Sequence, residues 1–276
     1  MDNNPQPMPV QWYPGHMSKS IRMMRESISL VDVLIEIVDA RCPRASRNPD
    51  IDSLAGGKKR LIVLNKCDLA DPIATTMWIK HFGAGALATN STTGEGIEKI
   101  AGMCRKLMQD KIEKAKRRGR LSVPVRAMIA GVPNVGKSTL INKFVGASPT
   151  KTGNKPGVTR GRQWIRLKQG FDLLDTPGIL WHRFDDAEVG INLALTGAIT
   201  DNILDTHGLA LILMGKLRQS YPSALKDRFG AEDIIGIARA RGYVKFANEA
   251  DTERAAAAVI NDFRSGKLGR ITLEKL

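Results

Sequence analysis

Cysteine is scarce in this 276-residue sequence, which contains only Cys42, Cys67 and Cys104. The three are far apart, odd in number, and lack the close spacing of metal-ligating cysteine pairs. They therefore predict neither a disulfide framework nor a cysteine metal site, and they favour a reducing compartment.

Long apolar runs are also missing. No run approaches the roughly 18 residues that a membrane-spanning helix requires. The opening residues, MDNNPQPMPVQW, have neither a basic nor an apolar leader region, and they are too acidic and too poor in arginine for a transit peptide. Because 42% of residues are hydrophobic and 25% charged, the chain should fold as a globular protein. We expect a cytoplasmic protein, monomeric when free, without a membrane partner.

Acidic residues are under-represented in the first two thirds of the chain. Residues 1–184 contain 30 Lys and Arg against 15 Asp and Glu, whereas residues 185–276 contain 12 against 13. Seven basic residues stand in each of the stretches 111–126 and 143–168, the first with one glutamate and the second with no acid. Such stretches favour nucleic acid through counterion release. The first also fits a solvated helix face.

Hydrophobic patterning predicts an α/β fold. Near-continuous apolar runs indicate buried parallel strands at residues 33–39, 60–64 and 126–130, with a weaker strand at 86–89 and two further strands at 163–167 and 171–174. Helical patterns cover residues 17–30, 72–82 and 96–118, and another helix starts near Lys137. After about residue 183 the strand signal fades, and Ala-rich segments such as 251–263 predict helices. We expect a mostly parallel-sheet domain at residues 1–183 and a small all-α C-terminal domain at 184–276.

Residues 131–138, GVPNVGKS, match the phosphate-loop pattern. They follow a predicted strand and open a predicted helix, which is the context that confirms the motif. Loop N–H groups and the helix N-terminus would surround the phosphates of a nucleotide. Lys137 should reach the β- and γ-phosphates, and the Ser138 hydroxyl should ligate Mg²⁺. The predicted nucleotide-binding residues here are Asn134, Val135, Gly136, Lys137, Ser138 and Thr139.

The segment DTPG, residues 175–178, ends a hydrophobic strand. Asp175 could hold Mg²⁺ through water, and the Gly178 N–H could touch a γ-phosphate. Taken alone, an aspartate at a strand end is often a simple turn former. Between the two motifs, Thr159 offers a hydroxyl for the Mg²⁺ shell in a switch loop that the triphosphate would order. Without that context it could equally be an ordinary loop threonine.

Base recognition is predicted at residues 65–68, NKCD. The Asp68 carboxylate could accept the N1–H and 2-amino hydrogens of guanine. Adenine offers neither, and sites of this kind discriminate by about 10⁴–10⁵. Asn65 would tie this loop to the phosphate loop, and Lys66 would cover the base with its stem. The predicted nucleotide-binding residues of the loop are Asn65, Lys66, Cys67 and Asp68. Asn90 and Ser91 belong to a second base loop, where the Ser91 N–H would meet the guanine 6-oxygen. GTP and GDP are therefore the predicted ligands.

The order of these motifs is permuted. In ordinary GTPases the phosphate loop precedes the guanine motifs, but here residues 65–68 and 90–92 precede residues 131–138. The site can still close, because strands need only be adjacent in space. The chain also runs from DTPG directly into the C-terminal domain, so a change in that switch would act on the domain.

This motif order, together with residues 12–17 (WYPGHM), Asp39-Ala-Arg41 and Asn134, resembles the circularly permuted GTPase family. The resemblance covers essentially the whole chain and is closest to the bacterial ribosome biogenesis GTPase A group, with its mitochondrial relative next. It implies a GTPase that assists late maturation of the large ribosomal subunit and leaves on hydrolysis. It also implies a helical C-terminal domain that contacts ribosomal RNA. Since residues 185–276 carry no basic surplus, either their basic residues share one face or the first domain supplies most RNA affinity.

The predicted catalytic residues are His16, Lys137 and Thr159. Ile179 and Leu180 follow DTPG where many GTPases have a water-orienting glutamine, so intrinsic turnover should be slow. Supplying a missing catalytic group accelerates phosphoryl transfer by about 10³–10⁵. His16 resembles the family's candidate water-orienting histidine, although a structural or RNA-contacting role is the alternative. Asn134 resembles the asparagine that helps hold K⁺ in related enzymes.

Another class of protein is also compatible with the charge pattern: an RNA-binding scaffold with only a residual, non-catalytic guanine nucleotide site. The intact set of Lys137, Ser138, Thr159 and Asp175 argues against it. GTPases of tRNA modification or membrane trafficking lack the permuted order, and the sequence carries no lipidation signal.

Overall fold

The computed structural model describes residues 22, 24–120, 123–146, 163–167, 170–175, 186–200 and 205–276. Its sheet has six strands, β1 (Val33–Asp39), β2 (Lys59–Asn65), β3 (Ala86–Thr89), β4 (Val125–Gly131), β5 (Gln163–Leu167) and β6 (Phe171–Asp175). They lie in the order β3-β2-β1-β4-β6-β5. All neighbours pair in parallel except β5, which is antiparallel to β6. The predicted α/β fold with a mostly parallel sheet is confirmed.

The central strand β1 shows why the apolar runs predicted this sheet. All seven of its residues are buried, because both faces of the sheet are covered. Successive side chains point to opposite faces. Accordingly Ile35 and Ile37 pack into the largest hydrophobic cluster, while Leu34 packs into a second cluster with Ile51.

The helices beside the sheet are α2 (Pro49–Leu54), α3 (Pro72–Phe82), α4 (Ile97–Leu107), α5 (Gln109–Arg117) and α6 (Lys137–Val145), with the short 3₁₀ helix η1 (Gly83–Gly85) after α3. The stretch expected to be helical at residues 96–118 is helical but forms two helices, α4 and α5, instead of one. The backbone breaks at Met108, with φ −103° and ψ 13°, where the last turn of α4 tightens as the Met108 N–H bonds to the Arg105 carbonyl. Of the helix expected at 17–30, the described residues 24–28 are helical.

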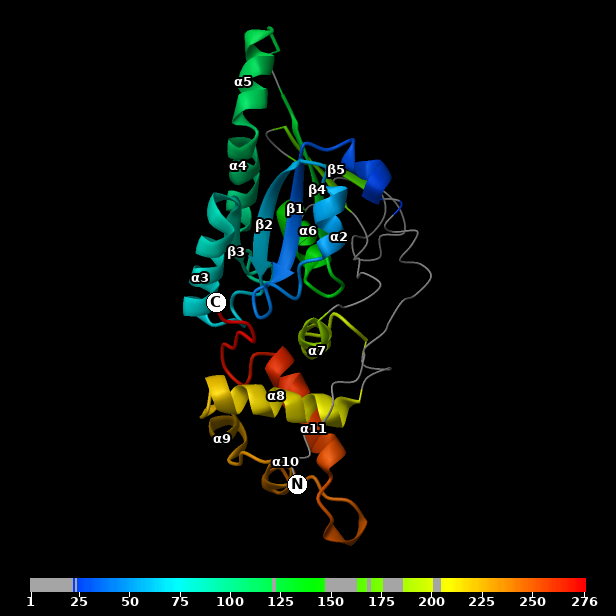
Figure 1. The fold of residues 1–276 in the computed structure, drawn as a ribbon, viewed down its shortest axis with the longest axis vertical. Coiled ribbons are helices and arrows are strands. Elements are labelled where there is room, and N and C mark those ends of the chain that lie inside the picture. The colour runs from blue at the N-terminus through cyan, green and yellow to red at the C-terminus, as the bar shows by residue number, and fades with distance from the viewer. Residues whose placement is uncertain are drawn as a thin grey trace.

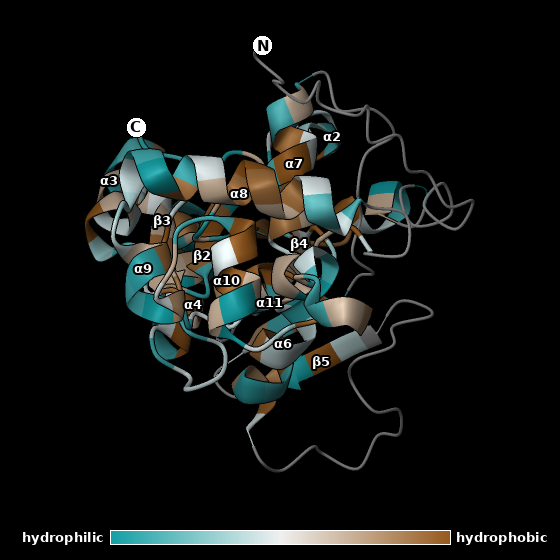
Figure 2. Ribbon diagram, turned by 90° about the horizontal axis from the view of Figure 1, so that it is seen from below, coloured by the Kyte–Doolittle hydropathy of each residue, from teal (hydrophilic) through white to brown (hydrophobic). Residues whose placement is uncertain are grey.

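The C-terminal part is helical, as predicted. It contains α7 (Ala187–Leu195), α8 (Thr206–Ser220), α9 (Ala224–Phe229), α10 (Ile234–Ala240), η3 (Phe246–Asn248) and α11 (Thr252–Arg264). Aspartates start several of these helices, since the side chains of Asp205, Asp233 and Asp251 accept backbone N–H groups of the first turn. In Figure 1 helices α8 to α11 lie below the sheet, and in Figure 2 their ribbons carry both hydrophobic and hydrophilic residues. In the described part of the chain, no helix combines the length and apolar character needed to cross a membrane.

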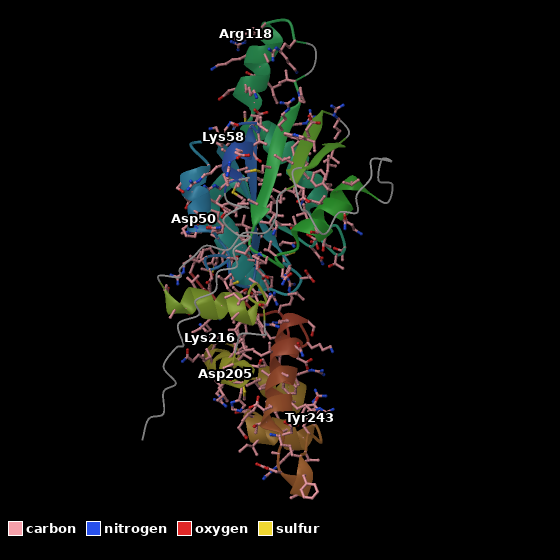
Figure 3. The ribbon with its side chains drawn as sticks, turned by 90° about the vertical axis from the view of Figure 1, so that its right-hand side faces the viewer. Asp50, Lys58, Arg118, Asp205, Lys216 and Tyr243 are labelled. Carbon is pink, nitrogen blue, oxygen red and sulfur yellow. The ribbon has the colours of Figure 1, made fainter. Side chains whose placement is uncertain are left out.

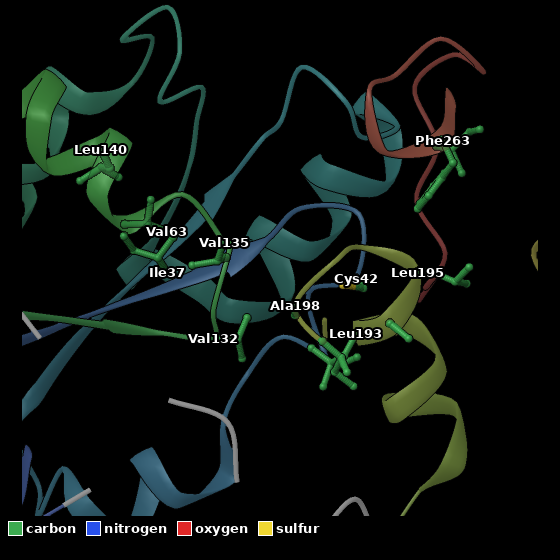
Figure 4. Close-up of a cluster of buried hydrophobic side chains, with 14 of the residues drawn as sticks. Ile37, Cys42, Val63, Val132, Val135, Leu140, Leu193, Leu195, Ala198 and Phe263 are labelled. Carbon is green, nitrogen blue, oxygen red and sulfur yellow. The ribbon is translucent and has the colours of Figure 1, made fainter. Parts of the chain in front are cut away.

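The two parts are in extensive contact. The largest hydrophobic cluster is continuous from Val132 and Val135 near the end of β4 to Leu193 and Ala198 around α7, as Figure 4 shows. After α11 the chain returns to the sheet, where the Leu273 N–H donates to the Arg41 carbonyl at 2.7 Å. The boundary near residue 183 falls outside the described residues, so the division into residues 1–183 and 184–276 stays a prediction.

Candidate functional site

The predicted loops meet at one edge of the sheet. Strands β1, β2, β3, β4 and β6 run in parallel, so their carboxyl ends share an edge. Those ends are Asp39, Asn65, Thr89, Gly131 and Asp175. Ligands of open α/β sheets bind in the crevice outside such strand ends. The parallel strands therefore bring the phosphate loop, the two guanine motifs and Asp175 to one edge of the sheet, although the motifs are permuted along the chain.

The phosphate loop, residues 131–138, needs glycine at two positions. Gly131 has φ 158°, and a Cβ there would lie 2.5 Å from the Ile37 carbonyl oxygen. Gly136 has φ 99°, and a Cβ there would lie 2.3 Å from the side-chain nitrogen of Asn65. Between them Val135 is 1% exposed and fixes the loop in the core. The loop can therefore approach both a ligand and the neighbouring guanine motif closely.

Lys137 opens α6 and is buried in the loop. Its ammonium donates to the carbonyl oxygens of Gly131 at 3.0 Å and Val132 at 2.8 Å. Burial lowers the pKa of Lys137 to about 8, against the opposing effect of the nearby Asp175 charge. Phosphate oxygens would replace the two carbonyls as partners and favour the charged form of the ammonium.

The residues predicted to hold Mg²⁺ lie on adjacent elements. Ser138 is half-buried in the first turn of α6, followed by the exposed Thr139. Asp175 is buried at the end of β6, which pairs with β4. Hydroxyl and carboxylate oxygens suit Mg²⁺. Within the described ranges no three His, Cys, Asp or Glu residues gather in a metal-binding group.

Asn65 joins three loops. Its side-chain nitrogen donates to the Val135 carbonyl oxygen at 2.8 Å. Its side-chain oxygen accepts from the Thr89 hydroxyl at 3.2 Å and from the Ser91 hydroxyl at 2.7 Å. The expectation that Asn65 ties the guanine motif to the phosphate loop is confirmed.

The polar groups of the second base loop bond to neighbouring loop residues. The Ser91 N–H, expected to meet the guanine 6-oxygen, donates to the Asn65 side-chain oxygen at 3.1 Å. Asn90 is buried, and its side-chain oxygen accepts the N–H groups of Thr92 and Thr93 at 2.9 and 3.2 Å. These bonds join and shape the loops, and the role of Asn90 and Ser91 toward the guanine base stays a prediction.

Residues 65–71 form a turn that we call the guanine loop. Lys66 takes the left-handed φ of 61°, and the Cys67 N–H donates to the Thr89 carbonyl at 3.2 Å. Burial, followed by the charges of Glu95 and Asp68, raises the pKa of the half-buried Cys67 thiol. Asp68 is exposed, as a carboxylate that must receive a base would be.

A buried charge network behind the guanine loop had no role in the sequence prediction. The Lys66 ammonium lies 2.9 Å from a carboxylate oxygen of Asp39. Arg41 donates to both oxygens of Asp39, at 2.9 and 2.8 Å, and is 1% exposed. Burial raises the pKa of Asp39, but the charges of Arg41 and Lys66 outweigh burial and leave that pKa lowered. The Asp39-Ala-Arg41 triplet at a strand end was the sequence feature that could have indicated this charge network.

Asn134, predicted to help hold K⁺, is exposed with a φ of 57°. Its side-chain nitrogen donates to the Gly197 carbonyl oxygen at 2.8 Å, which links the phosphate loop to the segment after α7. Its role toward K⁺ stays a prediction. His16, Thr159 and Gly178 lie outside the described residues.

Comparisons with known proteins agree with this geometry. A family model described as 50S ribosome-binding GTPase matches residues 126–213. Ribosome biogenesis GTPase A of Bacillus cereus is 43% identical, over 97% of this chain and 94% of that protein. Mitochondrial ribosome-associated GTPase 1 of Bos taurus is 32% identical, over 96% and 89% of the two chains. The solved structure of GNP-bound YlqF from T. maritima superposes with a TM-score of 0.65 at 27% identity, covering 93% of this chain and 98% of that one.

The matches extend over nearly the full length of the chain, and they include both the bacterial group and the mitochondrial relative that the motifs suggested. The strand ends bring a phosphate loop and an NKxD motif to one edge of the sheet, where the bond from Asn65 to Val135 joins them. On both grounds, the chain belongs to the ribosome biogenesis GTPase A family.

Proposed function

We propose that this chain is a GTP-hydrolysing assembly factor that binds the maturing large ribosomal subunit in its GTP form and leaves after hydrolysis. The observation that carries the proposal is the hydrogen bond from Asn65 to Val135, because it joins the base-specific motif to the phosphate loop. The Bacillus relative is named for ribosome biogenesis, and the matching family model for binding the 50S subunit.

The nucleotide would lie with its base against the guanine loop and its phosphates in the loop of residues 131–138. Lys137 and the N–H groups that open α6 would neutralise the phosphates. Ser138 and Asp175 would hold Mg²⁺, with Thr159 and the Gly178 N–H as further contacts in the triphosphate state. When bound, Mg²⁺ offsets the charge that develops on the phosphate oxygens during transfer.

The same loop offers a place for a second cation. The Asn134 side-chain nitrogen bonds Gly197, so the side-chain oxygen is the atom that would bind a cation. We propose that this oxygen is a ligand of K⁺. We also propose that His16 orients the attacking water. His16 and Asn134 would take over the role of the glutamine that many GTPases have after DTPG and that this chain lacks. Because the glutamine is missing, we expect intrinsic hydrolysis to be slow and to be stimulated by the ribosomal subunit.

Helix α5 supplies a basic surface for ribosomal RNA. No residue of α5 is buried, and the helix projects beyond the sheet, with Arg118 just past its far end in Figure 3. A hollow of about 470 Å³ beside it is lined by one acidic residue, Asp110, and by five basic residues, Lys59, Lys111, Lys114, Arg118 and Arg120. Phosphate groups are the complementary partner for such a surface. This surface supports the alternative in which the first domain provides much of the RNA affinity.

The proposal is tested by sedimenting the protein with large ribosomal subunits under a GTP analogue, GDP and no nucleotide, and by measuring phosphate release with and without subunits. We expect co-sedimentation only with the GTP analogue, and faster release with subunits. Binding that ignores the nucleotide, or a protein that releases no phosphate, would support the scaffold alternative.

The RNA surface has its own test. Changing both Lys114 and Arg118 to glutamate should weaken subunit binding and reduce its salt dependence, while GDP affinity stays unchanged. The matched control changes Lys80 and Lys99, on α3 and α4, to glutamate. Equal loss of subunit binding in both double variants would show a non-specific charge effect.

A further inference from the structure

The guanine loop is held from two sides, and one side is the end of the chain. On the first side, Asn65 faces the phosphate loop. On the second side lies the C-terminal segment, residues 264–274, which returns from α11. The Gly266 backbone approaches so closely that a Cβ there would lie 2.7 Å from the Leu69 side chain.

The C-terminal segment satisfies three carbonyl groups of the guanine loop. Arg270 donates to the Cys67 carbonyl at 2.8 Å and to the Ala70 carbonyl at 2.9 Å. The Ile271 N–H donates to the Leu69 carbonyl at 3.0 Å. Cys67 and Leu69 directly flank Asp68, the residue predicted to recognise guanine. One arginine therefore fixes the loop on both sides of the specificity carboxylate through charged hydrogen bonds.

A side-chain path reaches the same segment from Lys66. The Lys66 ammonium is held by Asp39, and Asp39 is held by Arg41. Arg41 in turn donates to the Arg264 carbonyl at 3.3 Å and to the Thr196 carbonyl at 3.4 Å. Its guanidinium lies 5.2 Å from the centre of the Phe263 ring. The end of α11 and the residue after α7 thus exclude water from the pair that orients Lys66.

We propose that Arg270 is a positioning residue for guanine recognition, and that the C-terminal segment links the docking of the helical part to the affinity of the site for the guanine base. This deepens the proposed function, because it concerns regulation of the same nucleotide site. Binding sites require their supporting groups to hold the recognition atoms within about 0.5 Å, and Arg270 does this for Asp68 through the Cys67 and Ala70 carbonyls.

Linkage makes the effect reciprocal. A guanine nucleotide that orders residues 65–71 stabilises the docked C-terminal segment, and displacement of that segment weakens nucleotide binding by the same factor. Because the contacts act on the base side, GDP and GTP lose affinity equally. A partner that pulls the helical part away would therefore promote release of either nucleotide, which differs from a switch that senses the γ-phosphate.

The test compares Arg270→Ala with Lys267→Ala, which removes the same charge from an exposed side chain of the same segment. Affinities for GDP, a non-hydrolysable GTP analogue and inosine diphosphate are measured by fluorescence competition. Inosine diphosphate keeps the N1–H but lacks the 2-amino group. We expect Arg270→Ala to weaken both guanine nucleotides equally, by about 5- to 150-fold as for other coupled sites, and to reduce the preference for GDP over inosine diphosphate. Lys267→Ala should match the parent protein.

Two outcomes overturn the proposal: unchanged GDP affinity in Arg270→Ala, or equal losses for GDP and inosine diphosphate, which is the result of general damage to the fold. If Arg270→Ala does not fold, hydrogen exchange of the parent protein decides. GDP should then slow exchange of the Ile271 and Leu273 amides, and unchanged exchange contradicts the linkage. Failure of the parent protein to prefer GDP over ADP would contradict the proposed function itself, so the two failures are distinguishable.

Discussion

Asn65 donates a hydrogen bond to the carbonyl oxygen of Val135 at 2.8 Å, across 70 residues of sequence. Asn65 is 1% exposed, and its side-chain oxygen accepts bonds from the second base loop as well. This one side chain therefore joins the parts of the site that the permuted order separates along the chain.

Asn65→Ala should weaken both the fold and the site. Removing the amide leaves the buried Val135 carbonyl and Ser91 hydroxyl without a partner, which costs about 1–3 kcal/mol in the free energy of unfolding. A loss of that size in the bound state corresponds to about 5- to 150-fold in GDP affinity. Urea unfolding without nucleotide and GDP titration measure the two effects. The control is Asn261→Ala, at an exposed position on α11. Unchanged values for Asn65→Ala would show that the bridge is unimportant.

Nucleotide affinity should depend on pH through Lys137. Its pKa is about 8 in the free protein because the ammonium is buried. Phosphates stabilise the charged form, so binding raises this pKa and takes up a proton above pH 8. GDP affinity should be constant well below pH 8 and should fall as the pH rises through 8, by at most about tenfold per pH unit for one proton.

The matched variant for this prediction is Lys137→Arg, whose side chain remains charged throughout this range. It should bind GDP more weakly, because the guanidinium does not fit the pocket shaped for an ammonium, but its affinity should not depend on pH in this window. Titration at several pH values compares the two proteins. The same slope in the variant would assign the proton to another group.

Glu274 should stabilise the docked C-terminal segment. Its carboxylate accepts the N–H groups of Arg44 at 2.7 Å and Ala45 at 3.0 Å, and the side-chain nitrogen of Asn192 at 3.1 Å. We expect Glu274→Ala to lower the free energy of unfolding by about 1–3 kcal/mol, since buried donors lose their acceptor. Glu249→Ala, at an exposed position, is the control for denaturant unfolding. If the free energy of unfolding changes no more than in the control, the Glu274 hydrogen bonds do not stabilise the docked C-terminal segment.

His16→Ala should lower subunit-stimulated phosphate release by about 10²-fold or more, if the histidine orients the attacking water. Affinity for a GTP analogue should stay near that of the parent protein. His207→Ala, on α8, provides the control. Equal losses of turnover and affinity would instead indicate a structural histidine.

The sequence predicted most of the sheet and the meeting of the loops, because buried parallel strands read as apolar runs and the phosphate loop is defined by glycine positions. Strand β1 was predicted at its observed residues, and β2 within one residue at either end. Helix α2 was missed because its six residues are too few to show a helical period, although the Asn48 cap followed by Pro49 marked its start.

The supporting groups of the site could not be predicted in the same way. Arg270 and Glu274 form hydrogen bonds with residues more than 200 positions earlier in the chain. No local sequence pattern predicts contacts at that separation. Asp39-Ala-Arg41 was visible as a motif, but its role depends on Lys66 and on the cover that Phe263 provides. The engagement of Ser91 by Asn65 likewise depends on three loops meeting.

Nucleotide competition with Asp68→Asn reports directly on whether the guanine loop and the phosphate loop form one pocket. An asparagine amide can donate to the 2-carbonyl of xanthine but cannot accept both guanine hydrogens. We expect the variant to lose at least about 10²-fold in GDP affinity and to gain affinity for xanthosine diphosphate, while ADP binding stays weak. An unchanged preference for GDP in this variant would contradict the account, because it would mean that the guanine loop and the phosphate loop do not form one pocket.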